Sequence, residues 1–218
     1  MSRAVIFDLD GTLLDTLEDL GECTNAVLRA LGHPEHPLDA YRWLVGEGMA
    51  NLVRGALPEA TRDAATVARG LALLEQKYEA GWRRHTAPYP GITAALGELL
   101  ALRVPMAVLS NKADGFTQEM VAHYFGAGAF VRVLGSRPPT PRKPDPAAAL
   151  DVAAALGVPP GEIAFVGDTR VDMETAVNAG MRPVGVTWGF RPEAELRAHG
   201  AQAIVRSPAE LVRAITRP

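Results

Sequence analysis

The chain has 218 residues, of which 48% are hydrophobic and 22% are charged, and its net charge is -3. This composition is typical of a soluble globular protein, and the length allows one domain or two small ones with a buried core. The slight negative charge argues against a nucleic-acid partner, and no apolar run is long enough to span a membrane. The single cysteine excludes a disulfide framework, so we expect a cytoplasmic protein.

The first predicted strand, residues 4–7, leads directly into two aspartates, Asp8 and Asp10, which are followed by Gly11 and Thr12. Two carboxylates at this spacing repel one another, so the stretch needs a chemical explanation. An Asp-Gly pair is also a common turn signal, and a turn that simply ends the strand is the plain structural explanation.

Residues 15–87 contain no convincing strand. Apolar residues recur at helical spacing from Leu17 to Leu31, and Gly32 is a plausible C-terminal cap. Further helices are predicted around residues 41–44, 49–57 and 61–82. A helical insert of about 70 residues is large enough for a small domain. We therefore predict an α/β core of residues 1–14 and 88–218, and an all-helical inserted domain of residues 15–87.

Beyond the insert, short apolar runs alternate with helical patterns. This alternation predicts βαβ units in a Rossmann-like, doubly wound parallel sheet. Near-continuous apolarity indicates strands that are buried on both faces. The predicted strands are residues 104–109, 130–134, 163–166 and 183–186, with an edge strand at 203–205. The predicted helices are residues 92–102, 116–125, 146–156 and 173–179.

Polar side chains stand at the ends of these apolar elements. Ser110 and Asn111 follow one strand, Asp168 follows another with Asp172 four residues on, and Lys143 precedes a predicted helix. Ligands of open α/β sheets bind beyond the carboxyl ends of the strands, so these groups should converge with the first two aspartates. Each feature alone has a structural explanation, as a helix cap, a strand end or a solvated lysine. Their joint order and placement favour a functional site.

Clustered carboxylates are stable only if they share protons or bind a cation. A few hard oxygen ligands suit Mg²⁺, which also takes a phosphate oxygen of a substrate. One carboxylate can attack phosphorus, and a second can protonate the leaving oxygen and then deprotonate water. The metal, Lys143 and the backbone N–H groups near Gly11 and Thr12 would offset the repulsion between the nucleophile and a phosphate.

The residues 8–12 (DLDGT), Ser110-Asn111, Lys143-Pro144 and 167–172 (GDTRVD) resemble, in the right order, the four motifs of the haloacid dehalogenase-like superfamily. The resemblance covers nearly the whole chain, and the insert is similar to the helical C1 cap of that family. It implies that Asp8 is the nucleophile and Asp10 the general acid/base.

The same resemblance implies roles for the other motif residues. Ser110 and Lys143 would bind the phosphoryl group, and Lys143 would also restrain Asp8. A magnesium ion would be held by Asp8, the backbone carbonyl of Asp10, and Asp168, with Asp172 acting through a water or from behind the ligands. The substrate-binding residues predicted in this way are Gly11, Thr12, Ser110, Asn111, Lys143 and Glu47.

Several stretches are similar to phosphoglycolate phosphatases and their close relatives: 45–48 (VGEG), 89–91 (YPG), 142–146 (RKPDP) and 187–190 (TWGF). Glu47 stands where those enzymes more often carry a neutral or basic residue. Facing the substrate, its carboxylate would repel a second carboxylate; pointing to solvent, it would not.

We predict a Mg²⁺-dependent phosphatase that acts on a small phosphorylated metabolite through a phospho-Asp8 intermediate, with 2-phosphoglycolate as the first expected substrate. The alternatives are a phosphomutase resembling β-phosphoglucomutase, and a phosphatase for pyrophosphate, sugar phosphates or nucleotides. A non-catalytic binding protein would be expected to lack Asp8, Lys143 or Asp168. A dehalogenase would have no need of Asp10. No nucleic acid and no membrane are expected as partners.

Overall fold

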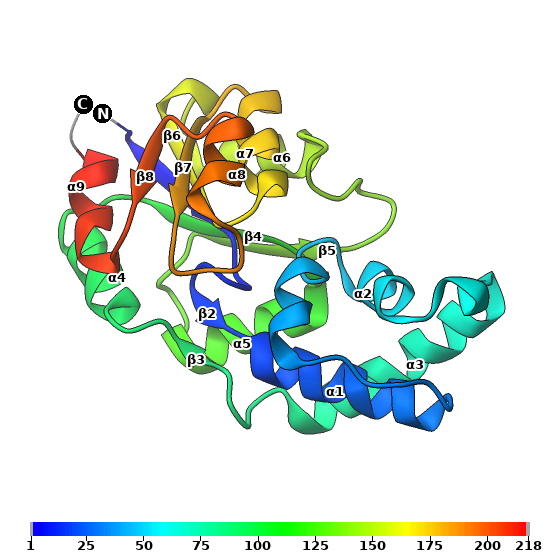
Figure 1. Ribbon diagram of the computed structural model, residues 1–218. Coiled ribbons are helices and arrows are strands. Elements are labelled where there is room, and N and C mark those ends of the chain that lie inside the picture. The colour runs from blue at the N-terminus through cyan, green and yellow to red at the C-terminus, as the bar shows by residue number, and fades with distance from the viewer. Residues whose placement is uncertain (1, 217–218) are drawn as a thin grey trace.

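The computed structural model describes residues 2–216, and at its centre lies a six-stranded sheet (Figure 1). The strand order is β5-β4-β1-β6-β7-β8, and every neighbouring pair is parallel. The chain winds away from β1 in both directions, which confirms the predicted doubly wound sheet. The strands are β1 (Ala4–Phe7), β4 (Met106–Ala113), β5 (Arg132–Ser136), β6 (Ile163–Gly167), β7 (Arg182–Val186) and β8 (Ala203–Val205).

Helices cover both faces of this sheet. Val5 and Phe7 of β1 pack on the side of α4 (Ile92–Ala101) and α9 (Leu211–Thr216). Ala4 and Ile6 point the other way, into a cluster with α6 (Ala147–Leu156) and α7 (Arg170–Asn178). Because successive side chains of a strand face opposite sides, a strand covered on both faces must be apolar throughout, as β1 is. The remaining helices of the core are α5 (Asp114–Phe125) and α8 (Glu193–Ala198).

The insert forms a helical cap beside the carboxyl ends of the strands (Figure 1). Its helices are α1 (Leu17–Ala30), α2 (Met49–Ala56) and α3 (Ala64–Gly81), and α1 packs against both of the others. Short 3₁₀ helices at Leu38–Trp43 and Glu59–Thr61 connect them. The side chain of Asp63 caps α3 by accepting a hydrogen bond from the Thr66 N–H at 3.0 Å. The hydrophobic core continues from the sheet into this cap.

The two connections between the core and the cap pair with each other. β2 (Leu14–Asp15) and β3 (Ala87–Pro88) form a two-stranded antiparallel sheet. The prediction that residues 15–87 hold no strand is therefore wrong at Asp15 and Ala87. The paired strands coincide with the predicted domain boundaries, although the division into two domains itself stays a prediction.

Most of the predicted elements are present, and the differences lie at their ends. The strand predicted at 104–109 begins at Met106 and continues through the polar residues to Ala113. The strand predicted at 130–134 is shifted to Arg132–Ser136. The helix predicted at 173–179 begins at Arg170, and the one predicted around 41–44 is a 3₁₀ helix. No helix within residues 2–216 combines the length and apolarity needed to cross a lipid bilayer.

Candidate active site

Asp8 lies directly beyond β1, and its N–H donates to the carbonyl of Val166 on the neighbouring strand at 2.9 Å. Its side chain faces Lys143, whose ammonium lies 2.9 Å from Asp8 Oδ1. The same ammonium donates a hydrogen bond to Asp172 Oδ1 at 2.7 Å. Lys143 therefore bridges Asp8 and Asp172, which are far apart in the sequence, and all three side chains are buried.

Asp168 follows β6 and is held by two donors. The hydroxyl of Thr12 donates to Asp168 Oδ1 at 2.8 Å, and the N–H of Phe190 donates to Oδ2 at 2.8 Å. Asp168 is fully buried. These two hydrogen bonds fix the orientation of a carboxylate that has no cation among its hydrogen-bond donors.

Asp172 lies in the first turn of α7 and has two structural partners there. Its Oδ2 accepts hydrogen bonds from the Thr169 N–H at 3.0 Å and from the Thr169 hydroxyl at 2.8 Å. This arrangement is a capping box at the start of the helix. Because its other oxygen binds Lys143, Asp172 ties the helix start to the lysine.

The electrostatics of these carboxylates are unusual. Burial, together with the charge of Asp172, raises the pKa of Asp8 to about 7, even though Lys143 lowers it. Burial and the charges of Asp172 and Asp8 also raise the pKa of Asp168 well above its ordinary value. Burial by itself lowers the pKa of Lys143, but Asp172 and Asp8 raise it above its usual range. Burial and the neighbouring carboxylates therefore disfavour the charged forms of Asp8 and Asp168 despite the ammonium of Lys143.

This arrangement fits a hard divalent cation. Oxygens of Asp8, Asp168 and Asp172 lie within 4.8 Å of one another, and all three residues are buried. Asp8 Oδ1 is buried without a hydrogen bond, because its contact with Lys143 lies outside hydrogen-bond geometry. Both oxygens of Asp172 are already hydrogen-bonded. Asp8 and Asp168 are therefore the better candidates for direct ligands, with Asp172 behind them.

The turn after Asp10 depends on Gly11, which has a φ of +83°. A Cβ on this glycine would lie 2.3 Å from Asp168 Oδ2, so no side chain fits. The N–H of Gly11 donates to the carbonyl of Leu14 and the N–H of Thr12 to that of Leu9. Neither residue lines the cavity described below. Gly11 and Thr12 therefore position the turn and Asp168, and their contact with substrate stays a prediction.

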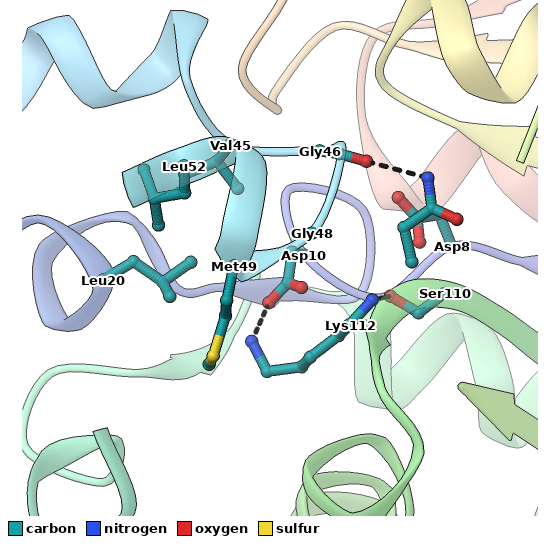
Figure 2. A pocket seen from close by; sticks show the side chains of 11 residues that line it. Asp8, Asp10, Leu20, Val45, Gly46, Gly48, Met49, Leu52, Ser110 and Lys112 are labelled. Carbon is teal, nitrogen blue, oxygen red and sulfur yellow. Dashed lines mark hydrogen bonds and ion pairs between the residues drawn. The ribbon is translucent and has the colours of Figure 1, made fainter. Parts of the chain in front are cut away.

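Ser110 and Asn111 lie in β4, and both line the cavity. Asn111 is also a structural clamp. Its Oδ1 accepts from the Lys143 N–H at 2.9 Å, and its Nδ2 donates to the carbonyls of Lys143 and of Gly46 in the cap, each at 3.1 Å. These bonds occupy the amide, so the side chain positions Lys143 and the cap loop. Figure 2 shows the contact with Gly46.

A cavity with about 380 Å³ of empty space, part of it open to solvent, lies between the cap and the ends of the strands (Figure 2). Asp8, Asp10 and Ser110 contribute to its core side, and Met49 and Leu52 of α2 to its cap side. The structure thus brings the predicted nucleophile, the predicted acid/base and the hydroxyl predicted to bind the phosphoryl group to one cavity.

Lys112 is a member of the site that the sequence analysis missed. Its ammonium donates to Asp10 Oδ1 at 2.8 Å, and its side chain is 2% exposed (Figure 2). It follows Ser110-Asn111 directly, and the continuation of β4 past Leu109 carries it into the cavity wall. The sequence carried no local signal for this role, because the predicted strand ended at residue 109 and Lys112 lay beyond it.

Glu47 does not line the cavity. Its carboxylate, about half exposed, forms an ion pair with Arg170 at the start of α7. The ion pair joins the cap to the core and partly neutralises the charge of Glu47. The contact of Glu47 with substrate stays a prediction.

Comparison with known proteins agrees with this geometry. The family model for haloacid dehalogenase-like hydrolases matches residues 5–186. A phosphoglycolate phosphatase of Chromobacterium violaceum is 35% identical over 214 residues, which cover 96% of this chain and 94% of the relative. One from Pseudomonas putida is 35% identical over 216 residues, covering 97% and 76% respectively.

The solved structure of a protein from Lactobacillus delbrueckii subsp. bulgaricus is similar over the full length of both chains, with a TM-score of 0.94 and 31% identity. The family model covers the strands that carry Asp8, Ser110 and Asp168, and the similarity of the solved structure extends through the cap. The chain belongs to the haloacid dehalogenase-like hydrolase family.

Proposed function

We propose that this protein is a Mg²⁺-dependent phosphatase that hydrolyses a small phosphorylated metabolite through a phospho-Asp8 intermediate, with 2-phosphoglycolate as its substrate. The observation that carries the proposal is a buried carboxylate, Asp8, paired with Lys143 and exposed to a cavity that also holds Asp10. The relatives named phosphoglycolate phosphatase support the choice of substrate.

The metal would be held by Asp8, Asp168 and the backbone carbonyl of Asp10, with Asp172 and Thr12 supporting the ligands. Bound there, Mg²⁺ supplies positive charge that offsets the carboxylates and the transferring phosphoryl group. The hydrogen bonds inside the turn use the carbonyls of Leu9 and Leu14, which leaves the Asp10 carbonyl free of them.

In the first step, an oxygen of Asp8 attacks phosphorus, the bond between phosphorus and the ester oxygen breaks, and Asp10 gives its proton to the leaving oxygen. In the second step, Asp10 takes a proton from water, and the water oxygen attacks the phosphorus of phospho-Asp8. Inorganic phosphate leaves and Asp8 is restored. Lys143 and the hydroxyl of Ser110 would bind the phosphoryl oxygens during both steps.

The cavity beneath the cap is small. The space in it that admits a water-sized molecule is about 30 Å³, well below the usual volume of ligand pockets, about 300–1,000 Å³. The cap must therefore move for a phosphoester to enter, and a short ester needs less movement than a nucleotide. Val45, Met49 and Leu52 give the cap side an apolar surface, which excludes water from the acyl phosphate.

The test is phosphate release from a panel of phosphoesters, with Mg²⁺ and with chelator. The panel contains 2-phosphoglycolate, hexose and pentose phosphates, nucleoside monophosphates and pyrophosphate. We expect Mg²⁺-dependent release, fastest from 2-phosphoglycolate, and loss of at least 10³-fold in Asp8→Asn, an order of magnitude typical of a removed nucleophile. Asp151→Asn, which makes the same change at an exposed carboxylate of α6, is the matched control.

Retention of activity in Asp8→Asn would contradict the mechanism. If another ester releases phosphate faster than 2-phosphoglycolate, the mechanism is retained and that ester replaces 2-phosphoglycolate as the proposed substrate. No release from any ester by the folded protein would reject the phosphatase function.

A further inference from the structure

Lys112 is a buried cation whose partners come from both the core and the cap. Its ammonium donates to Asp10 Oδ1 at 2.8 Å on the core side. It also lies 4.6 Å from the centre of the Tyr78 ring of cap helix α3, in cation–π geometry. Tyr78 is itself fully buried. The ammonium is therefore fixed at the boundary between core and cap, and it is not a solvated surface charge.

The positive charge of Lys112 differs from the charges of the other residues in the cavity wall. Two are carboxylates, Asp8 and Asp10, and the rest are apolar or neutral. A second anionic group on a substrate would be repelled by the carboxylates and desolvated by the apolar cap side. Among the residues that line the cavity, Lys112 is the only one whose charge could offset both effects. The remaining lining residues are Leu20, Val45, Gly46, Gly48, Met49, Leu52, Ser110 and Asn111.

We propose that Lys112 binds a carboxylate of the substrate and determines the preference of this enzyme for phosphoesters that carry one. The inference rests on the proposed phosphatase function and assigns the residue that selects its substrate class.

The ammonium has donors to spare for this role. It carries three N–H groups, and within residues 2–216 Asp10 is the oxygen acceptor found for it. Ser110, which would bind the phosphoryl group, lies two residues earlier in β4 and lines the same small cavity, and its hydroxyl accepts a hydrogen bond from the Lys112 N–H at 3.2 Å. A substrate that touches both groups therefore has a short skeleton between phosphate and carboxylate, as a phosphorylated two-carbon hydroxy acid does.

The experiment compares two esters that differ in the distal group: 2-phosphoglycolate, with a carboxylate, and 2-hydroxyethyl phosphate, with a neutral hydroxyl. The quantity measured is the ratio of their kcat/KM values. We expect the wild-type ratio to favour the carboxylate at least 10-fold and Lys112→Met to lower the ratio about 10- to 100-fold, the usual loss for a charge-assisted hydrogen bond. A general loss of activity from the altered Asp10 environment cancels in this ratio.

Three further variants separate the charge from other effects. Lys112→Arg keeps a cation and should retain part of the preference. Lys112→Gln removes the charge but can still hydrogen-bond to Asp10, so it replaces the methionine variant if that one does not fold. Arg54→Met removes a cation of cap helix α2 that donates to the Arg62 carbonyl and does not line the cavity, and it should leave the ratio unchanged.

Binding to the Asp8→Asn protein tests the same inference without turnover. Calorimetry with both esters, with and without Lys112→Met, should show the same collapse of the affinity ratio. An unchanged ratio in kinetics and in binding would overturn the role of Lys112, whatever the enzyme hydrolyses. A wild type that shows no preference for the carboxylate in either measurement would also overturn it. Absence of turnover, with a binding ratio that still depends on Lys112, would reject the phosphatase function alone.

Discussion

Asp8 is a residue whose charge is costly to the fold. Its pKa is raised to about 7 by burial and by Asp172, so the folded protein keeps a proton that the unfolded chain has already lost. The pKa of Asp8 is higher in the folded protein than in the unfolded chain. Asp8 therefore contributes its full stability below about pH 4, and this contribution is lost as the pH rises towards 7. Above that range, the buried charge destabilises the metal-free protein.

We therefore expect the metal-free wild type to lose thermal stability, relative to Asp8→Asn, as the pH rises from 4 to 8. The asparagine is a neutral group of the same shape, so it removes the charge that the wild type acquires. Melting temperatures in chelator, measured at each pH, test this. Mg²⁺ should raise the melting temperature of the wild type more than that of the variant at pH 8. Parallel pH profiles for the two proteins would contradict the assignment of this titration to Asp8.

Thr12 acts on the site through Asp168. Thr12→Val keeps the shape of the side chain but removes the 2.8 Å hydrogen bond that orients the carboxylate. We expect the Mg²⁺ concentration for half-maximal activity to rise about 10- to 100-fold, as is usual when a partner of a metal ligand is lost. Calorimetric titration with Mg²⁺ provides a reading independent of turnover. Thr12→Ser keeps the hydroxyl and should stay near wild type; an equal loss in both variants would point to packing instead.

At the scale of elements, the site depends on how closely the turn after β1 approaches the end of β6. Gly11→Ala adds a Cβ 2.3 Å from Asp168 Oδ2 at a position with a φ of +83°. We expect it to lower the free energy of unfolding by about 2–4 kcal/mol, about 1 kcal/mol from the backbone strain and the rest from overlap. Denaturant titration measures this loss.

Gly157→Ala is the matched control for that variant. Gly157 also has a positive φ, +66°, in the left-handed region, but a Cβ there has no neighbour within 4 Å. It should cost only the strain, about 1 kcal/mol. Equal losses in the two variants would show that overlap with Asp168 adds nothing, and that the turn has room to relax.

At the scale of the whole molecule, the loop before α2 holds the cap against the core. Arg191 donates to the carbonyls of Trp43 and Val45 at 3.2 and 3.3 Å, and its guanidinium lies 5.1 Å from the centre of the Trp43 ring. Arg42 of the cap donates in return to the Gly189 carbonyl at 2.9 Å. These contacts link the cap to the core beside the cavity.

We expect Arg191→Met to raise KM about 10-fold, because loss of about 1.4 kcal/mol from the closed arrangement lowers the fraction of protein that is competent to bind. Amide exchange in residues 43–48 should become faster in the same variant. Arg206→Met removes an exposed arginine of the core that pairs with Glu193 of α8, and it should change neither quantity. Unchanged KM and exchange in Arg191→Met would show that these contacts do not govern closure.

The ends of the elements show where sequence reasoning was limited. β4 begins after Pro105, which has no N–H for the ladder, and this could have been read from the sequence. The start of α7 also had a local signal, since Thr169 and Asp172 form a capping box. The extension of β4 through Lys112 had no such signal, because its burial depends on Asp10 and Tyr78, which are distant in the sequence.

The sequence by itself determined the α/β class, the helical insert, and the order of the charged residues at the ends of the strands. It could do so because local apolar patterns define strands, and the carboxyl ends of parallel strands meet at one edge of the sheet. Only the tertiary structure decided which charges are paired. Lys112 pairs with Asp10, which is 102 residues away in the sequence, and Arg170 pairs with Glu47, which is 123 residues away. Such pairs form only when the cap and the strands come together, so no local pattern carries them.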